Sequence, residues 1–137
     1  MLDIRWTEIT TSDGQVARIE YDPEADILEI FFDSVQATTA VHLHDSIVLR
    51  INQPERRPSG LIIVGYRILS HPTAVGPRSI PLSNLDNLPE DLHALVSELV
   101  TTPPVSDLLK VTSYFPTKDQ LVTLAYVDCP AALALAA

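Results

Sequence analysis

The chain is poor in the residues that form covalent or metal cross-links, since its 137 residues include one cysteine and four histidines. That cysteine, Cys129, has no disulfide partner within the chain, and no Cys/His set has the spacing of a structural zinc site. No hydrophobic run approaches the roughly 20 residues needed to cross a bilayer. The N-terminal sequence MLDIRWTEIT also lacks the basic-then-apolar order of a signal peptide. We therefore expect a cytoplasmic protein without a membrane span.

Positive charge is scarce as well. Nine Lys and Arg stand against eighteen Asp and Glu, which gives a net charge of -9 at pH 7. A surface of this sign repels the phosphates of nucleic acids. The sequence also lacks the glycine-rich loops of nucleotide-binding proteins and the G-x-S-x-G elbow of serine hydrolases. These absences argue against nucleic-acid binding and serine hydrolysis, and we expect no cofactor.

What the chain does contain is enough apolar material for a folded core. Hydrophobic residues make up 46% and charged residues 20% of the sequence, a balance typical of globular proteins. At this length we expect a single domain, residues 1–137. Its parts are a hairpin region at 1–70, a proline-rich loop at 71–87, a helix with a β-hairpin at 88–128, and an apolar tail at 129–137.

Alternating or β-branched apolar segments, separated by turn residues, predict β-strands. They lie at residues 2–10, 16–21, 27–32, 37–43, 47–51, 61–69, 108–115 and 120–127. The Asp13-Gly14 pair indicates a tight hairpin between the first two segments. Residues 53–60 contain two prolines and a glycine and are expected to form a loop.

One segment, residues 88–101, has the period of an amphipathic helix, and Pro103 and Pro104 end it. Its apolar stripe consists of Leu88, Leu92, Leu95, Val96, Leu99 and Val100. The sequence therefore predicts an α+β fold, a mainly antiparallel sheet of six or seven strands with this helix on one face. Because strands such as 27–32 are apolar on both faces, we expect a homodimer in which a second copy covers the other face. We expect residues 120–127 and 131–137 to line that contact.

The segments IEYDPEADILEIFF, VHLHDSIVLRI and GLIIVGYRIL together resemble the domain-of-unknown-function 2283 family of small bacterial proteins. The residues that carry the resemblance are Tyr21, Asp22, Pro23 and Asp26 of a Tyr-Asp-Pro-x-x-Asp turn, and Gly65, Ile68 and Leu69 of a glycine-containing last strand, within Ile19 to Ser70. The chain departs from the family where His42 and His44 replace acidic residues and Ser46 replaces a glycine. The resemblance implies a compact antiparallel sheet, no established activity, and a toxin-like protein partner.

Asp22, Glu24 and Asp26 stand at alternate positions, as acidic residues do at the start of a calcium-binding loop. The glycine and the glutamate that such a loop needs at its sixth and twelfth positions are missing. We therefore predict a proline turn whose carboxylates accept hydrogen bonds from backbone amides or face solvent.

His42 and His44 stand two residues apart, so a strand would project both imidazoles from one face. With Asp45 as a ligand or base, they are the candidate metal ligands of a metal-assisted hydrolase. No residue at a recognisable spacing supplies a further ligand, and an exposed strand near a turn is the alternative interpretation.

A second set of candidates consists of arginines that could converge near one hairpin to hold an anion or an acidic partner. They are Arg50, Arg56, Arg57 and Arg67. A solvated loop with ordinary surface pairing is the alternative. The sequence as a whole predicts a non-catalytic, homo-oligomeric interaction or regulatory module, and the metal-assisted hydrolase is the alternative function.

Overall fold

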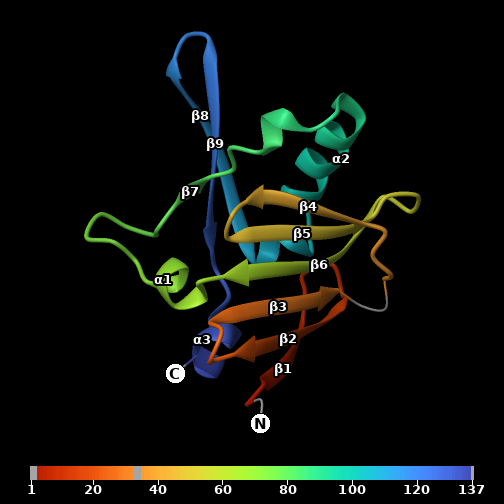
Figure 1. Cartoon of the computed structure of the whole chain (residues 1–137), viewed down its shortest axis with the longest axis vertical. Coiled ribbons are helices and arrows are strands. Elements are labelled where there is room, and N and C mark those ends of the chain that lie inside the picture. The colour runs from red at the N-terminus through yellow and green to blue at the C-terminus, as the bar shows by residue number, and fades with distance from the viewer. Residues whose placement is uncertain (1–2, 33–34, 137) are drawn as a thin grey trace.

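Two antiparallel sheets and a few short helices make up the fold (Figure 1). The computed structural model describes residues 3–32 and 35–136, while residues 1–2, 33–34 and 137 lie outside the described part. The large sheet contains β1 (Arg5–Thr10), β2 (Val16–Asp22), β3 (Ile27–Phe32), β4 (Thr39–His44), β5 (Ile47–Asn52) and β6 (Arg57–Val64). The small sheet contains β7 (Ile80–Pro81), β8 (Leu109–Thr117) and β9 (Gln120–Val127). The helices are α1 (Tyr66–Ser70), η1 (Leu85–Asn87), α2 (Glu90–Val100), η2 (Val105–Asp107) and α3 (Pro130–Ala136). The predicted α+β class is confirmed.

The large sheet has the strand order β1-β2-β3-β6-β5-β4, so two meanders meet where β3 pairs with β6. Ile30 lies at the centre of this junction, opposite Ile19 on β2 and Leu61 on β6. Strand alternation sends one set of side chains to a single buried face, which we call the inner face. Its members are Ala17, Ile19, Tyr21, Leu28, Ile30, Phe32, Val41, Leu43, Ile47, Leu49, Ile51, Leu61 and Ile63.

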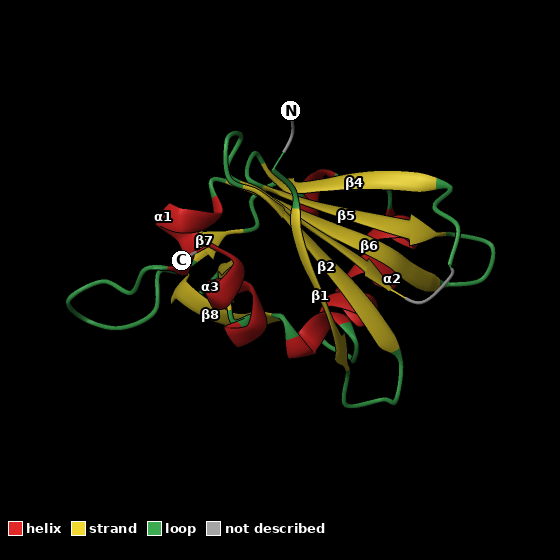
Figure 2. Ribbon diagram, turned by 90° about the horizontal axis from the view of Figure 1, so that it is seen from below, coloured by secondary structure: helices red, strands yellow, loops and turns green. Residues whose placement is uncertain are grey.

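The inner face is covered by the second half of the chain. Figure 2 shows α1, α3 and the small sheet gathered on one side of the large sheet. Helix α2 buries Leu95, Val96, Leu99 and Val100, which confirms the predicted helix and its apolar stripe. The two C-terminal strands form a sheet of their own with β7, separate from the large sheet.

The predicted strand at residues 61–69 is wrong at its C-terminal end, and the predicted loop at 53–60 is too long. β6 begins at Arg57 and ends at Val64, and helix α1 follows at once. The chain can turn here because Gly65 adopts the left-handed conformation, with φ 75°. Gly60 lies within β6, and the position requires glycine because a Cβ would lie 2.8 Å from the carbonyl oxygen of Ile30 on the neighbouring strand.

Asp26 holds this turn in place. Its backbone carbonyl accepts the N–H of Gly65 at 2.8 Å and of Tyr66 at 3.3 Å. Its carboxylate accepts the N–H of Arg67 at 3.1 Å and the hydroxyl of the buried Tyr21 at 2.6 Å. Asp26 itself has φ 55°, a conformation that Asn and Asp adopt more readily than other side chains do.

The apolar tail packs on the core as helix α3, in contact with β1 and β2. Ala132 is fully buried, and the Arg5 guanidinium donates a hydrogen bond to the Leu135 carbonyl at 2.8 Å. The tail therefore packs on its own chain, and the contact with a second copy expected for residues 131–137 stays a prediction. Leu133 keeps 52% of its surface exposed, and Ala137 lies outside the described residues. The proline-rich loop at 71–87 also contains short regular elements, β7 and η1.

Across the described residues, every helix is too short or too polar to pass through a bilayer.

We predict that Asp26→Ala lowers the free energy of unfolding by about 3 kcal/mol, since the buried Tyr21 hydroxyl and the amides at the start of α1 lose their acceptor. Ala at φ 55° adds strain. Asp26→Asn should cost less, because Asn tolerates this conformation and keeps one acceptor oxygen. Urea unfolding measures both.

Glu24→Ala is the control for this experiment, because Glu24 is exposed in the same turn and should change stability by no more than about 0.5 kcal/mol. Equal losses for the Glu24 and Asp26 variants would contradict the role given to Asp26.

Candidate functional site

The acidic turn after β2 is a structural corner. One carboxylate oxygen of Asp22 accepts the backbone N–H groups of Glu24 at 3.0 Å and Ala25 at 3.3 Å. The Asp26 carboxylate is engaged by Tyr21 and by the start of α1. The predicted proline turn with amide-bonded carboxylates is therefore confirmed.

Two tyrosines meet beneath this corner. Tyr21 and Tyr66 are fully buried and their rings pack edge to face, with centroids 5.9 Å apart. Burial, with the hydrogen bond to Asp26 as the next cause, raises the pKa of Tyr21 to about 12. Burial also raises the pKa of Tyr66, whose hydroxyl lies 3.5 Å from the carbonyl oxygen of Cys129. Burial likewise raises the pKa of the Cys129 thiol, which makes it a poor nucleophile.

The candidate metal ligands lie at the edge of the large sheet. His42 is exposed on β4, while Nδ1 of His44 accepts the backbone N–H of Ser46 at 3.1 Å. The pairing of β4 with β5 shifts register between the two histidines, and Asp45 lies exposed in the turn. No group of three or more His, Cys, Asp or Glu side chains in residues 3–32 and 35–136 could hold a metal ion. The His42/His44 hypothesis therefore lacks a described third ligand.

The four candidate arginines are spread along the sheet. Arg67 donates to the Pro23 carbonyl at 3.4 Å and lies beyond one end of β6, whereas Arg57 begins the other end of that strand. The remaining two form separate ion pairs, Arg50 with Glu29 at 3.6 Å and Arg56 with Glu98 at 3.2 Å. The structure therefore does not bring Arg67 together with Arg56 and Arg57, because a strand of eight residues spans about 25 Å.

The side of the large sheet opposite the core, which we call the outer face, mixes charged and apolar side chains. One row across it, strand by strand, reads Trp6, Glu20, Glu29, Ile62, Val48 and His42. Arg18 stacks 4.0 Å over the ring centroid of Trp6 and pairs with Glu20 at 3.8 Å. This face is therefore partly neutralised by its own ion pairs.

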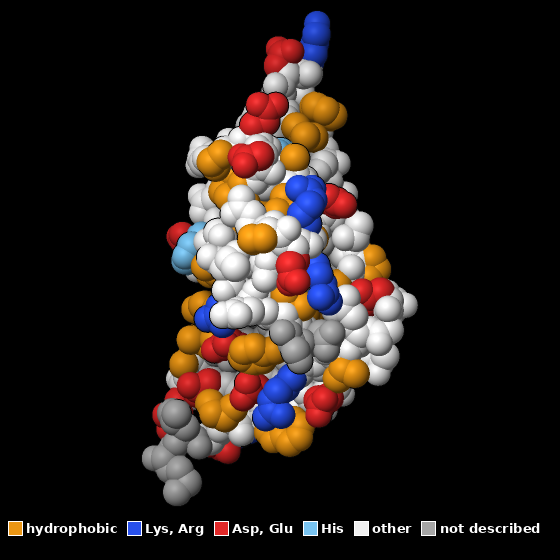
Figure 3. Space-filling model, turned by 90° about the vertical axis from the view of Figure 1, so that its right-hand side faces the viewer, with side chains coloured by type: hydrophobic (Ala, Val, Ile, Leu, Met, Phe, Trp, Pro, Cys, Tyr) orange, Lys and Arg blue, Asp and Glu red, His pale blue; other side chains and the backbone are white. Residues whose placement is uncertain are grey.

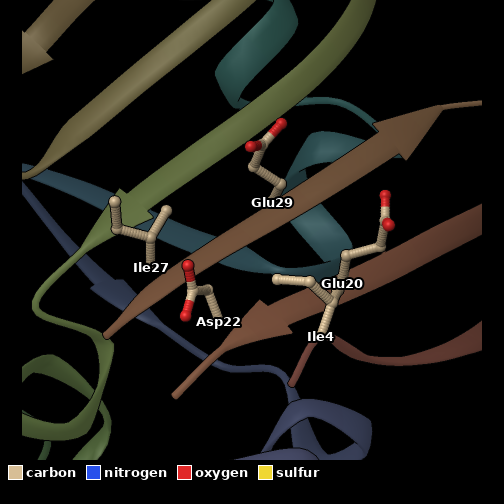
Figure 4. A pocket seen from close by; sticks show the side chains of 5 residues that line it. All are labelled: Ile4, Glu20, Asp22, Ile27 and Glu29. Carbon is tan, nitrogen blue, oxygen red and sulfur yellow. The ribbon is translucent and has the colours of Figure 1, made fainter. Parts of the chain in front are cut away.

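A shallow hollow of about 160 Å³ opens on the outer face (Figure 4). Glu20 and Glu29 face each other across β2 and β3, and Asp22 completes an acidic lining. Ile4 and Ile27 supply the apolar part of the wall. The hollow offers carboxylates and methyl groups together, a combination that suits the stem and charge of a lysine or arginine side chain.

The second surface of interest is a projecting hairpin. Beyond the point where β7 pairs with β9, β8 and β9 leave the body as a two-stranded ribbon, at the top of Figure 1. We call residues 112–123 the arm. Residues 112–121 are all exposed, and the exposed surface is 48% for Tyr114, 65% for Phe115 and 48% for Leu121. In Figure 3 the arm tapers upward from the body, with hydrophobic side chains along it and charged ones at its tip.

A groove lies at the base of the arm, between the arm, η1 and α2. We call it the arm–helix groove; its volume is about 200 Å³. Its lining consists of Leu85, Asp86, His93, Ser97, Val100, Thr101, Val111, Ser113, Leu121 and Thr123. Asp86 and His93 stand at its rim, 3.8 Å apart, and both are accessible to solvent. The groove thus combines an apolar floor with a charged edge.

The sequence predicts both strands of the arm but not that they project from the body. The sequence predicts a dimer contact for residues 120–127 but gives no such role to Tyr114 and Phe115, which are exposed. The available signal was the stretch TSYFPTKD, in which apolar and polar residues do not alternate and two aromatics precede a turn.

Comparison with models of protein families, with characterised proteins and with solved structures finds no match for this chain. The resemblance to the domain-of-unknown-function 2283 family therefore stays a prediction from the sequence.

We predict that alkaline pH destabilises the fold through Tyr21. Unfolded tyrosine loses its proton near pH 10, while the folded chain keeps the Tyr21 proton up to about pH 12. Between these values the folded state binds more protons, so stability falls by about 1.4 kcal/mol per pH unit from this residue. Denaturant unfolding between pH 9 and pH 12 measures the slope.

Tyr21→Phe should start from a lower stability, since Asp26 loses the hydrogen bond from the Tyr21 hydroxyl, and should show a shallower decline above pH 10. Tyr114→Phe, at an exposed tyrosine, should keep the original slope. A Tyr21→Phe variant whose stability declines as steeply as that of the unmodified chain would refute this account.

Proposed function

We propose that this chain is a non-catalytic interaction module that works as a homodimer and binds a basic protein partner. The observation that carries the proposal is the arm, an ordered two-stranded ribbon that stands away from the body with exposed aromatic and aliphatic side chains.

An isolated two-stranded hairpin is at best marginally stable in water, because neither of its faces is buried. The base of this one is anchored where Ile80 pairs with Ala125 and Pro81 with Leu124. Further out, its cross-strand support includes the pair Ser113 and Thr123, whose hydroxyls lie 3.1 Å apart. Exposed apolar side chains on such a ribbon favour a protein contact that covers them.

A homodimer is the simplest assembly that covers the exposed apolar side chains of the arm. In a twofold contact each copy uses the same patch, so both arms are covered at once and no further sites remain to propagate a chain of contacts. The expected homodimer is kept in this proposal, with its contact moved from the open sheet face to the arm. The reason is that two outer faces packed together would set the carboxylates of Glu20, Asp22 and Glu29 against those of the other copy.

The outer face then remains open for a different protein. Its hollow carries Glu20, Asp22 and Glu29, and the two arginine pairs at its edge are long and exposed, so they offer weak competition. A lysine or arginine of a partner would place its cation among these carboxylates and its methylene stem against Ile4 and Ile27. A basic partner is also the class that a chain of net charge -9 attracts at long range. The toxin-like partner implied by the family resemblance is the candidate for this role.

We predict a light-scattering mass near twice 15.1 kDa at micromolar concentration. Replacing Tyr114 and Phe115 together by serine should weaken the dimer by at least about 30-fold, as for an interface hot spot worth 2 kcal/mol or more. Sedimentation equilibrium over a concentration series measures the change.

The matched control replaces Ile68 and Val75 by serine. Both are exposed apolar residues, at 65% and 97%, and lie outside the arm, so the same loss of surface hydrophobicity should leave the dimer unchanged. A monomeric unmodified chain, or an arm variant that dimerises as well as the control, would disprove the homodimer.

We further predict that a synthetic peptide of alternating leucine and arginine binds at the hollow. Glu20→Gln with Glu29→Gln should weaken peptide binding about tenfold, the loss of roughly 1.4 kcal/mol of charge-assisted contact. Isothermal titration calorimetry measures the affinity.

Glu90→Gln with Asp91→Asn serves as the control, because it removes the same number of negative charges from exposed positions in the first turn of α2. Equal weakening in both double variants would mean that the peptide senses only net charge, and the hollow would no longer be a partner site.

A further inference from the structure

We infer that the arm of one chain docks in the arm–helix groove of a second copy, reciprocally about a twofold axis, with Lys118 at each tip meeting Asp86 of the other chain. This inference rests on the proposed homodimer and names the surface that receives each arm.

One face of the arm is continuous with the groove. Ser113 pairs with Thr123 across the hairpin, and both line the groove together with Val111 and Leu121. We call these four groove-lining residues the inner arm face. Phe115 lies two residues beyond Ser113 along β8, at the register shift between Tyr114 and Thr117 and next to the outer end of this face. A partner that fills the groove therefore also lies along this face and covers Phe115, the most exposed aromatic side chain of the arm.

The groove itself suits a side chain better than a separate ligand. Its volume of about 200 Å³ is below the range of roughly 300–1,000 Å³ that small-molecule pockets occupy. Its apolar floor includes Leu85 and Val100, both buried. An aromatic ring that enters from outside would complete the packing of this floor.

The positions of tip and groove on one arm favour a reciprocal contact. The groove lies at the base of the arm and Phe115 lies near its tip. Two arms laid antiparallel, with their inner arm faces in contact, therefore bring the tip of each arm to the base of the other. From Val111 to Phe115 the arm advances about 14 Å along the strand. The twofold axis makes the distance between tip and groove identical in both copies. If the tip of one arm reaches the groove of the second copy, the tip of the second arm therefore reaches the groove of the first.

Charge at the two ends agrees with this arrangement. Lys118 and Asp119 form the exposed turn at the tip, where Figure 3 shows charged side chains of both signs. Asp86 and His93 form the rim of the groove, and the Asp86 side chain is 81% exposed. Lys118 is one of only nine basic residues in the chain, and docking would set it against a carboxylate of the other copy.

The first test reverses charges. Lys118→Glu should raise the dimer dissociation constant about tenfold, and adding Asp86→Lys in the same chain should restore it, because each tip then meets an opposite charge again. Lys118→Glu with Asp45→Lys is the matched control, since it has the same net charge but places the new lysine in the exposed turn after β4. Equal rescue by the control would overturn the docking, because net charge would then explain the effect.

The second test separates this inference from the homodimer itself. Chains carrying Lys118→Cys are mixed with chains carrying Asp86→Cys under mild oxidation, and the native Cys129 stays as it is because it is buried. A mixed disulfide dimer is expected, while chains carrying Val75→Cys in place of Asp86→Cys should not cross-link with Lys118→Cys. A dimer by light scattering that gives no such cross-link would overturn the docking and leave the homodimer standing. A monomer would overturn both.

Discussion

The fold depends on one carboxylate, that of Asp26, which ties the turn between β2 and β3 to the end of β6. The hydroxyl of Tyr21 and the backbone of Arg67 both donate to it. Tyr21 is a buried member of the sheet, so the bond connects the core directly to the point where the chain leaves the large sheet. From Gly65 onward the chain lies on the inner side of that sheet, where α1, α3 and the small sheet cover it. The same bond therefore helps to fix the point at which the chain leaves the large sheet and crosses to its inner side.

The outer face stays open because the helices and the small sheet cover only the inner face of the large sheet. Apolar residues there, such as Phe31 and Ile62, are half-buried by their neighbours in the sheet alone. The guanidinium of Arg18 stacks over the ring of Trp6 and pairs with Glu20. Charged groups therefore cover part of the Trp6 ring. Such a surface is well solvated, whereas the arm exposes Phe115 and Leu121 without comparable ion pairs in the described structure. The structure thus exposes apolar side chains without such ion pairs on the hairpin, whereas the sequence predicted the surplus apolar surface on the sheet.

The limits of prediction follow from which interactions are local. The stripe of α2 and the proline turn are encoded within a few residues, and both are present as expected. The break at Gly65 depends on Asp26, far away in sequence, so the apolar run 61–69 alone indicated an unbroken strand. The sequence pattern of a strand also does not predict which other elements pack against that strand. The sequence therefore indicates a hairpin at the arm but not that the hairpin projects from the body. The distances between Arg57 and Arg67, or around His42, were equally out of reach because they are set by the sheet.

Electrostatics also favours the arm over the outer face as the contact of the proposed homodimer. Two bodies of net charge -9 repel each other, and face-to-face packing of the large sheets would bring both sets of carboxylates within a few ångströms. At physiological ionic strength exposed charges are largely screened beyond a Debye length of about 8 Å. An arm that extends about 20 Å over residues 112–117 keeps the two bodies apart by more than that distance. The apolar contact can then form between the tips and the grooves, while most of the repulsion is screened by solvent.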